Sequence, residues 1–168
     1  MEILSPRRAV EADFERLDLL YTEFHMFHVL GVSDRLRPLA APDERADKDV
    51  NTLRVALQNI LHSEDAALFV VEVDDRVVGF AEVYLRQEEE QPLVIAHRYG
   101  YLQSLMVSAP YRKLGLGEAL VKVAQQWAKE QGASEMQIET WEFAAGPVPF
   151  YEHLGYRTLK RHMVVDLL

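Results

Sequence analysis

The 168-residue sequence predicts an α/β protein of the α+β type, with a central mixed, mostly antiparallel β-sheet and about four flanking helices. Two observations support this class. The spacing of apolar residues switches between helical and alternating, which gives the order β-α-α-β-β-β-α-β-α-β. A strand–helix–strand unit in the second half makes one strand pair parallel, whereas an earlier hairpin requires antiparallel pairing. Since no repeat or long linker divides the chain, we expect a single domain over residues 1–168.

The first part of the chain is predicted to hold a short strand and two helices. Residues Ile3–Ser5 form the candidate strand. Apolar residues at helical spacing predict a helix over Asp13–Leu30, which Gly31 ends. The same pattern recurs over Lys48–His62, and the proline- and charge-rich segment 33–46 predicts a surface loop between the two helices.

The middle of the chain predicts three strands. Ala67–Val73 and Arg76–Arg86 are rich in Val, Phe and Tyr, and Asp74-Asp75 between them indicates a tight hairpin turn. Arg98–Val107 alternates in the same way. The later elements expected from spacing and from Gly and Pro positions are a helix over Leu116–Gln131, a strand over Glu135–Trp141, a short helix over Pro147–Leu154 and a final strand over Tyr156–Leu168.

Composition excludes several classes of function. The chain has no Cys, so it has no disulfide, no thiolate metal site and no cysteine acyl-enzyme. A net charge of −9 argues against a nucleic-acid partner. No apolar run approaches the roughly 20 residues of a membrane helix, and the N-terminus lacks the order of a signal peptide. We therefore expect a cytoplasmic protein with no membrane partner.

Paired histidines on the first helix suggest a metal at first sight. His25 and His28 lie one turn apart, but no third ligand has suitable spacing, so no metal is expected. The aromatic residues around them indicate a packed face instead.

A basic turn punctuated by glycines, Arg112–Gly117, lies between a predicted strand and an amphipathic helix. Free amides at a helix start form an anion site, and glycines let the backbone approach phosphate oxygens. The turn is not a dinucleotide fingerprint, because Leu120 occupies the place of the third glycine, and the chain contains no Gly-Lys-Ser/Thr. These residues predict a pyrophosphate site that is neither a dinucleotide-binding loop nor a Walker-type loop.

Three segments of the sequence resemble the GNAT family of N-acetyltransferases. Leu105-Met106-Val107 with Tyr111-Arg112-Lys113-Leu114-Gly115-Leu116-Gly117 resembles its acetyl-CoA signature, whose Arg/Gln-x-x-Gly-x-Gly/Ala core is matched in full. Phe150–Tyr156 resembles the closing motif, and Arg8–Asp13 resembles the usual opening of the first helix. The resemblance implies the GNAT fold, in which the two parallel strands splay apart around the cofactor.

The resemblance also implies roles for particular residues. The pyrophosphate of acetyl-CoA is expected on Arg112, Lys113, Leu114, Gly115, Leu116, Gly117 and Glu118. The strand edge at Leu105, Met106 and Val107 is expected to pair with the pantetheine arm, with an amide of Met106 or Val107 polarising the thioester carbonyl. Tyr151 is expected to be the acid that protonates the CoA thiolate; the alternative is that its ring only lines the pantetheine channel.

The expected reaction is transfer of an acetyl group to a primary amine of a small molecule or a protein. Without Cys, direct attack in a ternary complex is favoured over an acyl-enzyme. The sequence leaves the base open between bulk water and four side chains, which are Glu82, His97, Gln103 and Glu139. It leaves the acceptor open as well, although Tyr21–His28 is expected to shape its selectivity.

Two positions depart from the family pattern. Ala144 and Pro147 stand where relatives often carry Asn and Ala. This keeps two alternatives open: a CoA-binding sensor without catalysis, and an acyltransferase that uses another acyl-CoA. A homodimer is a further expectation, with Tyr156–Leu168 as the contact edge.

Overall fold

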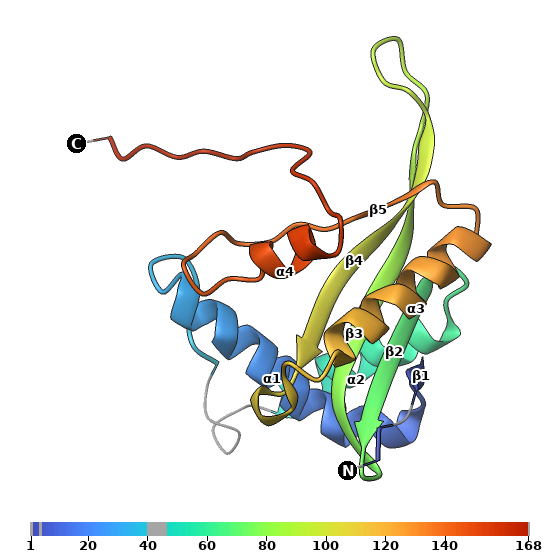
Figure 1. Ribbon diagram of the computed structural model, residues 1–168, viewed down its shortest axis with the longest axis vertical. Helices are drawn as coiled ribbons and strands as arrows, with labels where there is room; N and C mark the ends of the chain where they lie inside the picture. Colours follow the sequence, from blue (N-terminus) through green and yellow to red (C-terminus); the bar gives the residue numbers. More distant parts are fainter. Residues whose placement is uncertain (1, 4, 40–46, 168) are drawn as a thin grey trace.

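The computed structural model describes residues 2–3, 5–39 and 47–167, with only the backbone of 47–51 (Figure 1). Within these residues the fold is the predicted α/β class. The elements are β1 Arg7–Arg8, η1 Glu11–Asp13, α1 Phe14–Gly31, α2 Asp47–His62, β2 Ala66–Val73, β3 Arg76–Glu88, β4 His97–Val107, η2 Ala109–Tyr111, α3 Leu116–Glu130, β5 Glu135–Gln137 and α4 Val148–His153.

The five strands form one mixed sheet in the order β1-β2-β3-β4-β5. Among the described strands, β4 and β5 pair in parallel and the other neighbours pair antiparallel. The predicted hairpin turn is confirmed, because Asp74 and Asp75 both adopt positive φ, at 49° and 60°. This left-handed pair matches the twist of the flanking strands. The hairpin joining β3 to β4 projects well beyond the sheet (Figure 1).

Helices cover both faces of the sheet (Figure 1). On one face α3 buries Leu116, Leu120 and Trp127 against strand residues such as Val83. On the other face α1 and α2 contribute a second core; its fully buried members include Leu17, Leu20, Leu57, Val70 and Phe80. The sheet is therefore buried on both sides, which explains why β2 reads as an almost continuous apolar run.

A bulge interrupts β4 where it borders the cleft. Glu82 pairs with Ser104, but the next residue, Val83, pairs with Leu102, which leaves Gln103 as the extra residue on β4. Bulges of this kind bend a strand and re-aim its side chains. The parallel pairing of β4 with β5 spans only Tyr99–Tyr101 of β4, and the two strands diverge beyond it (Figure 1).

Three elements differ from the prediction by more than two residues. Ile3 makes only an isolated bridge to Val73, and the first strand is Arg7–Arg8. The strand expected to reach Trp141 ends at Gln137, because the chain there leaves β4. The expected final strand Tyr156–Leu168 is wrong over its described residues: 157–167 runs away from the body without a strand partner (Figure 1). Strand-forming residues become a strand only when a neighbouring edge is in reach.

Candidate functional site

A cavity of about 620 Å³ opens where β4 and β5 diverge. Its walls come from α1, the second half of β4, the start of α3, the segment after β5, and α4 with the residues before it. The predicted residues Leu105, Met106, Val107, Arg112, Lys113, Gly115, Leu116, Gly117, Glu118 and Tyr151 all line it. Leu114 does not line it and is partly exposed to solvent. Segments far apart in the sequence therefore meet at one cavity, although the role of each residue stays a prediction.

The two glycines of the turn meet different structural requirements: one needs a positive φ and the other needs space for a neighbouring helix. Gly115 precedes α3 with a φ of 79°, which other residues rarely adopt. A Cβ on Gly117 would lie 3.2 Å from Cζ of Phe150, so this glycine lets α4 approach α3. The first amides of α3 have no intrahelical acceptor and carry the positive end of the helix dipole. The backbone of the turn therefore has the geometry that suits an anion, and phosphate binding there stays a prediction.

The side chain of Arg112 is directed toward α1. Its Nε donates a hydrogen bond to the Val107 carbonyl at 2.9 Å, and its guanidinium lies 5.3 Å from the Phe27 ring centre. Its Nη2 is 3.7 Å from a carboxylate oxygen of Glu23. Arg112 therefore ties the turn to α1 and to the end of β4, while its role toward phosphate stays a prediction.

Glu23 is a residue that the sequence did not single out. Its carboxylate accepts hydrogen bonds from the hydroxyl of Ser108 at 2.7 Å and from the backbone amide of Ala109 at 2.8 Å. Together with the Arg112 contact, these bonds join α1 to the connection between β4 and α3. An acidic residue on a helix usually marks a solvated face, so no sequence signal distinguishes Glu23 from its neighbours.

Tyr151 lies within α4 on its buried side and is only 7% exposed. Its ring packs edge-on against Phe150 and Tyr156, with ring centres 5.1 and 5.5 Å apart. Burial, helped by Tyr156, raises the pKa of the Tyr151 phenol above its ordinary value. A phenol with a raised pKa keeps its proton at neutral pH, which an acid requires.

Of the four candidate bases, two line the cavity and two do not. Gln103 and Glu139 line the cavity. Glu82 is buried on the α1 face, where it accepts hydrogen bonds from the hydroxyls of Tyr21 at 2.7 Å and Tyr84 at 2.6 Å. Burial and this carboxylate raise the pKa of both tyrosines. His97 lies at the base of the projecting hairpin, 3.7 Å from Glu135.

The two histidines of α1 have different hydrogen-bond partners. Nδ1–H of His28 donates to the Phe24 carbonyl at 2.9 Å, which leaves Nε2 of the neutral ring as an acceptor, and His28 lines the cavity. His25 instead donates to the Arg37 carbonyl at 2.7 Å. Across the described residues, no group of three His, Cys, Asp or Glu side chains could hold a metal. In the same part of the chain, no helix combines the length and apolarity that crossing a membrane would demand.

Comparison with known proteins assigns the family. A family model described as the acetyltransferase (GNAT) family matches residues 33–156. The protein therefore belongs to the GNAT family of acetyltransferases.

The chain is similar to several curated proteins. A putative acetyltransferase of Bacillus subtilis is 37% identical over 44% of this chain and 47% of its own length. An N-alpha-acetyltransferase of Sulfurisphaera tokodaii is 31% identical over 63% of this chain and 66% of its own length. The chain thus spans about half to two thirds of these two relatives.

Solved structures share the fold over nearly the whole chain. A mutant of a Bacillus halodurans protein superposes with a TM-score of 0.83 at 22% identity, covering 98% of this chain and all of that one. The aminoglycoside acetyltransferase AAC(6')-Iy, in complex with a bisubstrate analogue of CoA and acetylneamine, gives 0.72 at 16% identity, covering 100% and 99% of the two chains. At such identities the likeness supports the fold alone.

Proposed function

We propose that this protein is an acetyl-CoA-dependent N-acetyltransferase that acts on a primary amine by direct attack in a ternary complex. The observation that carries the proposal is that one cavity combines the glycine turn at the start of α3, the diverging edge of β4 and the buried Tyr151. Membership of the acetyltransferase family supports it, as do relatives named for N-acetyl transfer.

The residues at the cavity fit CoA. The amides at the start of α3 suit a pyrophosphate, and a Cβ built at Gly115 would meet nothing within 4 Å, so the backbone there is open to a ligand. Beyond Tyr101 the outer edge of β4 has no strand partner among the described residues, so its outward-pointing backbone groups can pair with the pantetheine arm, except the Val107 carbonyl, which accepts a hydrogen bond from Arg112. Bound acetyl-CoA would supply the thioester that is attacked.

Each step then has a candidate group in the protein. Of the two amides expected to stabilise negative charge on the carbonyl oxygen, that of Val107 points to the open edge of β4, whereas that of Met106 faces its β3 partner Phe80. Tyr151 holds the proton that the departing thiolate needs. The amine must lose a proton, and the titratable side chains on the cavity wall away from the turn are Glu139 and His28.

Release of CoA in the presence of amines tests this proposal directly. A thiol reagent detects the product, and a chain without Cys gives no background. Binding of CoA is measured separately by calorimetry. Binding without turnover on any amine would favour a sensor, and faster turnover with succinyl-CoA than with acetyl-CoA would favour another acyl donor. Absence of CoA binding would refute the proposal.

We also propose a homodimer and a cytoplasmic location. The exposed apolar residues of 157–167 support the dimer. The absence of Cys fits a reducing compartment, so the location stays a prediction.

A further inference from the structure

One end of the cavity is lined mainly by residues outside the glycine turn and the β4 edge, although the guanidinium of Arg112 reaches Phe27 there. Its walls are Phe24, Phe27 and His28 from α1 and, opposite them, Glu139 and Thr140 beyond β5. The extra residue of the β4 bulge, Gln103, lines the cavity as well. If the function proposed above holds, the amine acceptor enters at this end, and these side chains decide which amines fit.

The α1 wall is aromatic. Phe24, Phe27 and His28 lie three and four residues apart, so they share one side of the helix. The His28 ring meets the rings of Phe24 and Phe27 edge-on, with centres 4.5 and 5.4 Å apart. All three side chains are only partly buried and face the cavity. They offer ring faces and edges to a ligand but few hydrogen-bonding groups.

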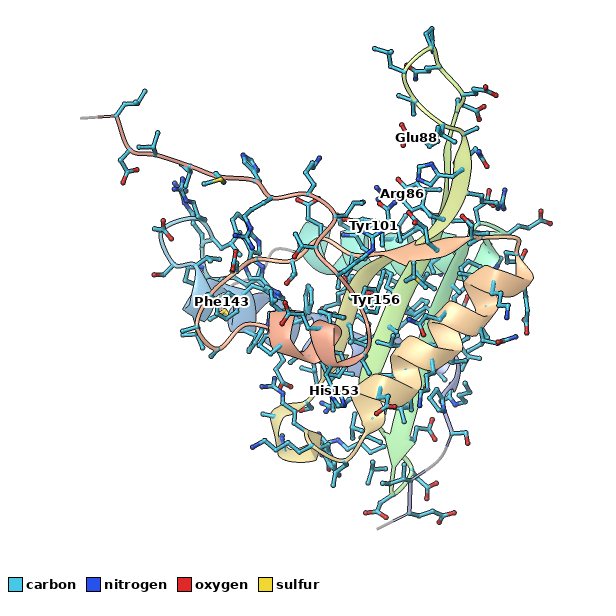
Figure 2. All side chains as sticks on the ribbon, turned by 45° about the horizontal axis from the view of Figure 1, so that its top comes forward. Arg86, Glu88, Tyr101, Phe143, His153 and Tyr156 are labelled. Atoms are coloured by element: carbon cyan, nitrogen blue, oxygen red, sulfur yellow. The ribbon has the colours of Figure 1, made fainter. Side chains whose placement is uncertain are left out.

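A second layer fixes this wall in place. Phe143, which follows β5, lies beside α1 (Figure 2). Its ring packs 5.6 Å from that of Phe27 and 6.4 Å from that of His28. Gly31 makes this contact feasible, since a Cβ there would lie 2.5 Å from Cε2 of Phe143. The wall is therefore supported from behind, and a flat ligand would meet a surface whose rings are already in position.

The charge at this end suits a single cation. Glu139 is the one carboxylate, among the described residues of the cavity, that lies away from the glycine turn. Glu118 lies at the turn and is paired with Lys122 at 2.6 Å. A ligand with many ammonium groups would leave most of them without a partner in the cavity, which is costly. One ammonium can face Glu139 and the aromatic rings together.

We propose that the acceptor is a monoamine whose primary amino group is carried by a short chain on an aromatic ring. The ring packs on Phe24 and His28 and meets the edge of Phe27, whose ring centre lies 5.3 Å from the guanidinium of Arg112. The amino group lies on the Glu139 side, facing the thioester. The nitrogen–carbonyl bond forms as the carbon–sulfur bond breaks. Nitrogen loses one proton, and the CoA thiolate gains one. This assignment differs from the polycationic acceptors for which the aminoglycoside-acetylating relatives are named.

The test compares kcat/KM for phenethylamine, butylamine and kanamycin A with the full chain and acetyl-CoA. We expect phenethylamine to exceed each of the others about tenfold or more, the usual gain from filling an apolar pocket. Kanamycin equal to or better than phenethylamine would overturn the inference and leave the acetyltransferase standing. No turnover with phenethylamine would overturn it as well, and the CoA calorimetry then decides separately whether the proposed function survives.

Substitutions test whether the aromatic side chains of α1 cause the preference for phenethylamine. Phe24→Leu should lower the ratio of kcat/KM for phenethylamine to that for butylamine about fivefold to tenfold, since an aliphatic side chain lacks the ring face. The ratio is measured within one preparation, so a loss of folded protein cancels. Glu139→Gln should raise KM for both amines and leave the CoA affinity unchanged. Leu30→Gln, on the same helix and 81% exposed, is the matched control. An unchanged ratio in Phe24→Leu would contradict the proposed binding mode.

Discussion

We predict that Tyr151, which lines the cavity, is the acid of the reaction, and Tyr151→Phe removes its hydroxyl while keeping the ring packing. We expect kcat to fall about a hundredfold, as for a lost general acid, with little change in stability. Because burial raises the pKa of Tyr151 above 10.0, wild-type activity should not decline through its ionisation as pH rises toward that value. Rates of CoA release from pH 6 to 10 for both proteins check this. A kcat within about twofold of wild type would mean that the ring only packs.

Glu23 links α1 to the glycine turn through Arg112 and to the residues just before that turn through Ser108 and Ala109. Glu23→Gln keeps an acceptor oxygen but removes the charge that faces Arg112. We expect the Kd for CoA to rise about threefold to tenfold, the usual value of a charge-assisted hydrogen bond at a partly exposed site. The KM for the amine should change less, since Glu23 contacts the turn.

Calorimetry with CoA measures the effect of Glu23→Gln. Glu15→Gln, an exposed residue of the same helix, is the control. If both variants bind CoA like wild type, the link does not position the turn.

At the scale of elements, an ion pair joins the start of the chain to η1. Asp13 is 6% exposed and accepts two hydrogen bonds from Arg7, at 2.8 and 2.9 Å, and one from the Val10 amide. Arg7 also pairs with Glu72 of β2. Burial alone would raise the pKa of Asp13, but the bonds from Arg7 and Val10 outweigh it and hold that pKa below its ordinary value.

Because the pKa of Asp13 is lowered in the folded state, its contribution to stability decreases as the pH falls. The contribution of Asp13 is complete above its unfolded pKa of 3.8 and is lost as pH falls through the lower folded value. Asp13→Asn should therefore cost about 1–2 kcal/mol at pH 7, a modest value because Arg7 is partly solvated. The difference from wild type should shrink below the unfolded pKa. Urea unfolding at pH 7 and pH 3 measures both, with Glu11→Gln as control; an equal difference at both pH values would assign the effect to packing instead.

Helices, strands and turns could be predicted from the sequence where neighbouring residues alone determine them. Apolar periodicity located α1, α2 and α3, and the Asp74-Asp75 turn followed from residues that tolerate positive φ. The end of β5 at Gln137 was not predictable, because it depends on how far β4 stays within reach and not on the residues of Ile138–Trp141. The bulge at Gln103 likewise arises from the registers of two strands, and no single segment encodes it.

The candidate site followed from sequence only where a motif is contiguous. The glycine turn and the α4 motif lie close to the strands that accompany them, so a resemblance could place them. The contacts of Glu23 with Ser108 and of Phe27 with Phe143 join residues that are distant in sequence. Only the folded chain brings these pairs together, and spacing carries no trace of them.

At the scale of the whole molecule, segment 157–167 is the candidate surface for contact with a second copy of the chain. It runs away from the body, and its side chains Leu159, Met163, Val164, Val165 and Leu167 are 67–93% exposed (Figure 1). Soluble monomers rarely leave contiguous apolar patches in water. A β-prone segment without a strand partner is also a template for pairing with another chain. A second copy of this chain offers the same segment in return, as a two-fold contact requires.

We therefore expect the wild-type chain to be a dimer in solution, and we expect charges in this segment to dissociate it. Val164→Glu with Val165→Glu should shift the dimer toward monomer by at least tenfold in Kd, because each buried carboxylate would lack a partner. Both positions are more than three-quarters exposed in one chain, so folding should be unaffected. Sedimentation over a hundredfold concentration range measures this, with Leu19→Gln on α1 as the control. A wild-type protein that stays monomeric throughout, or a double variant that dimerises as tightly as wild type, would show that segment 157–167 does not hold two copies together.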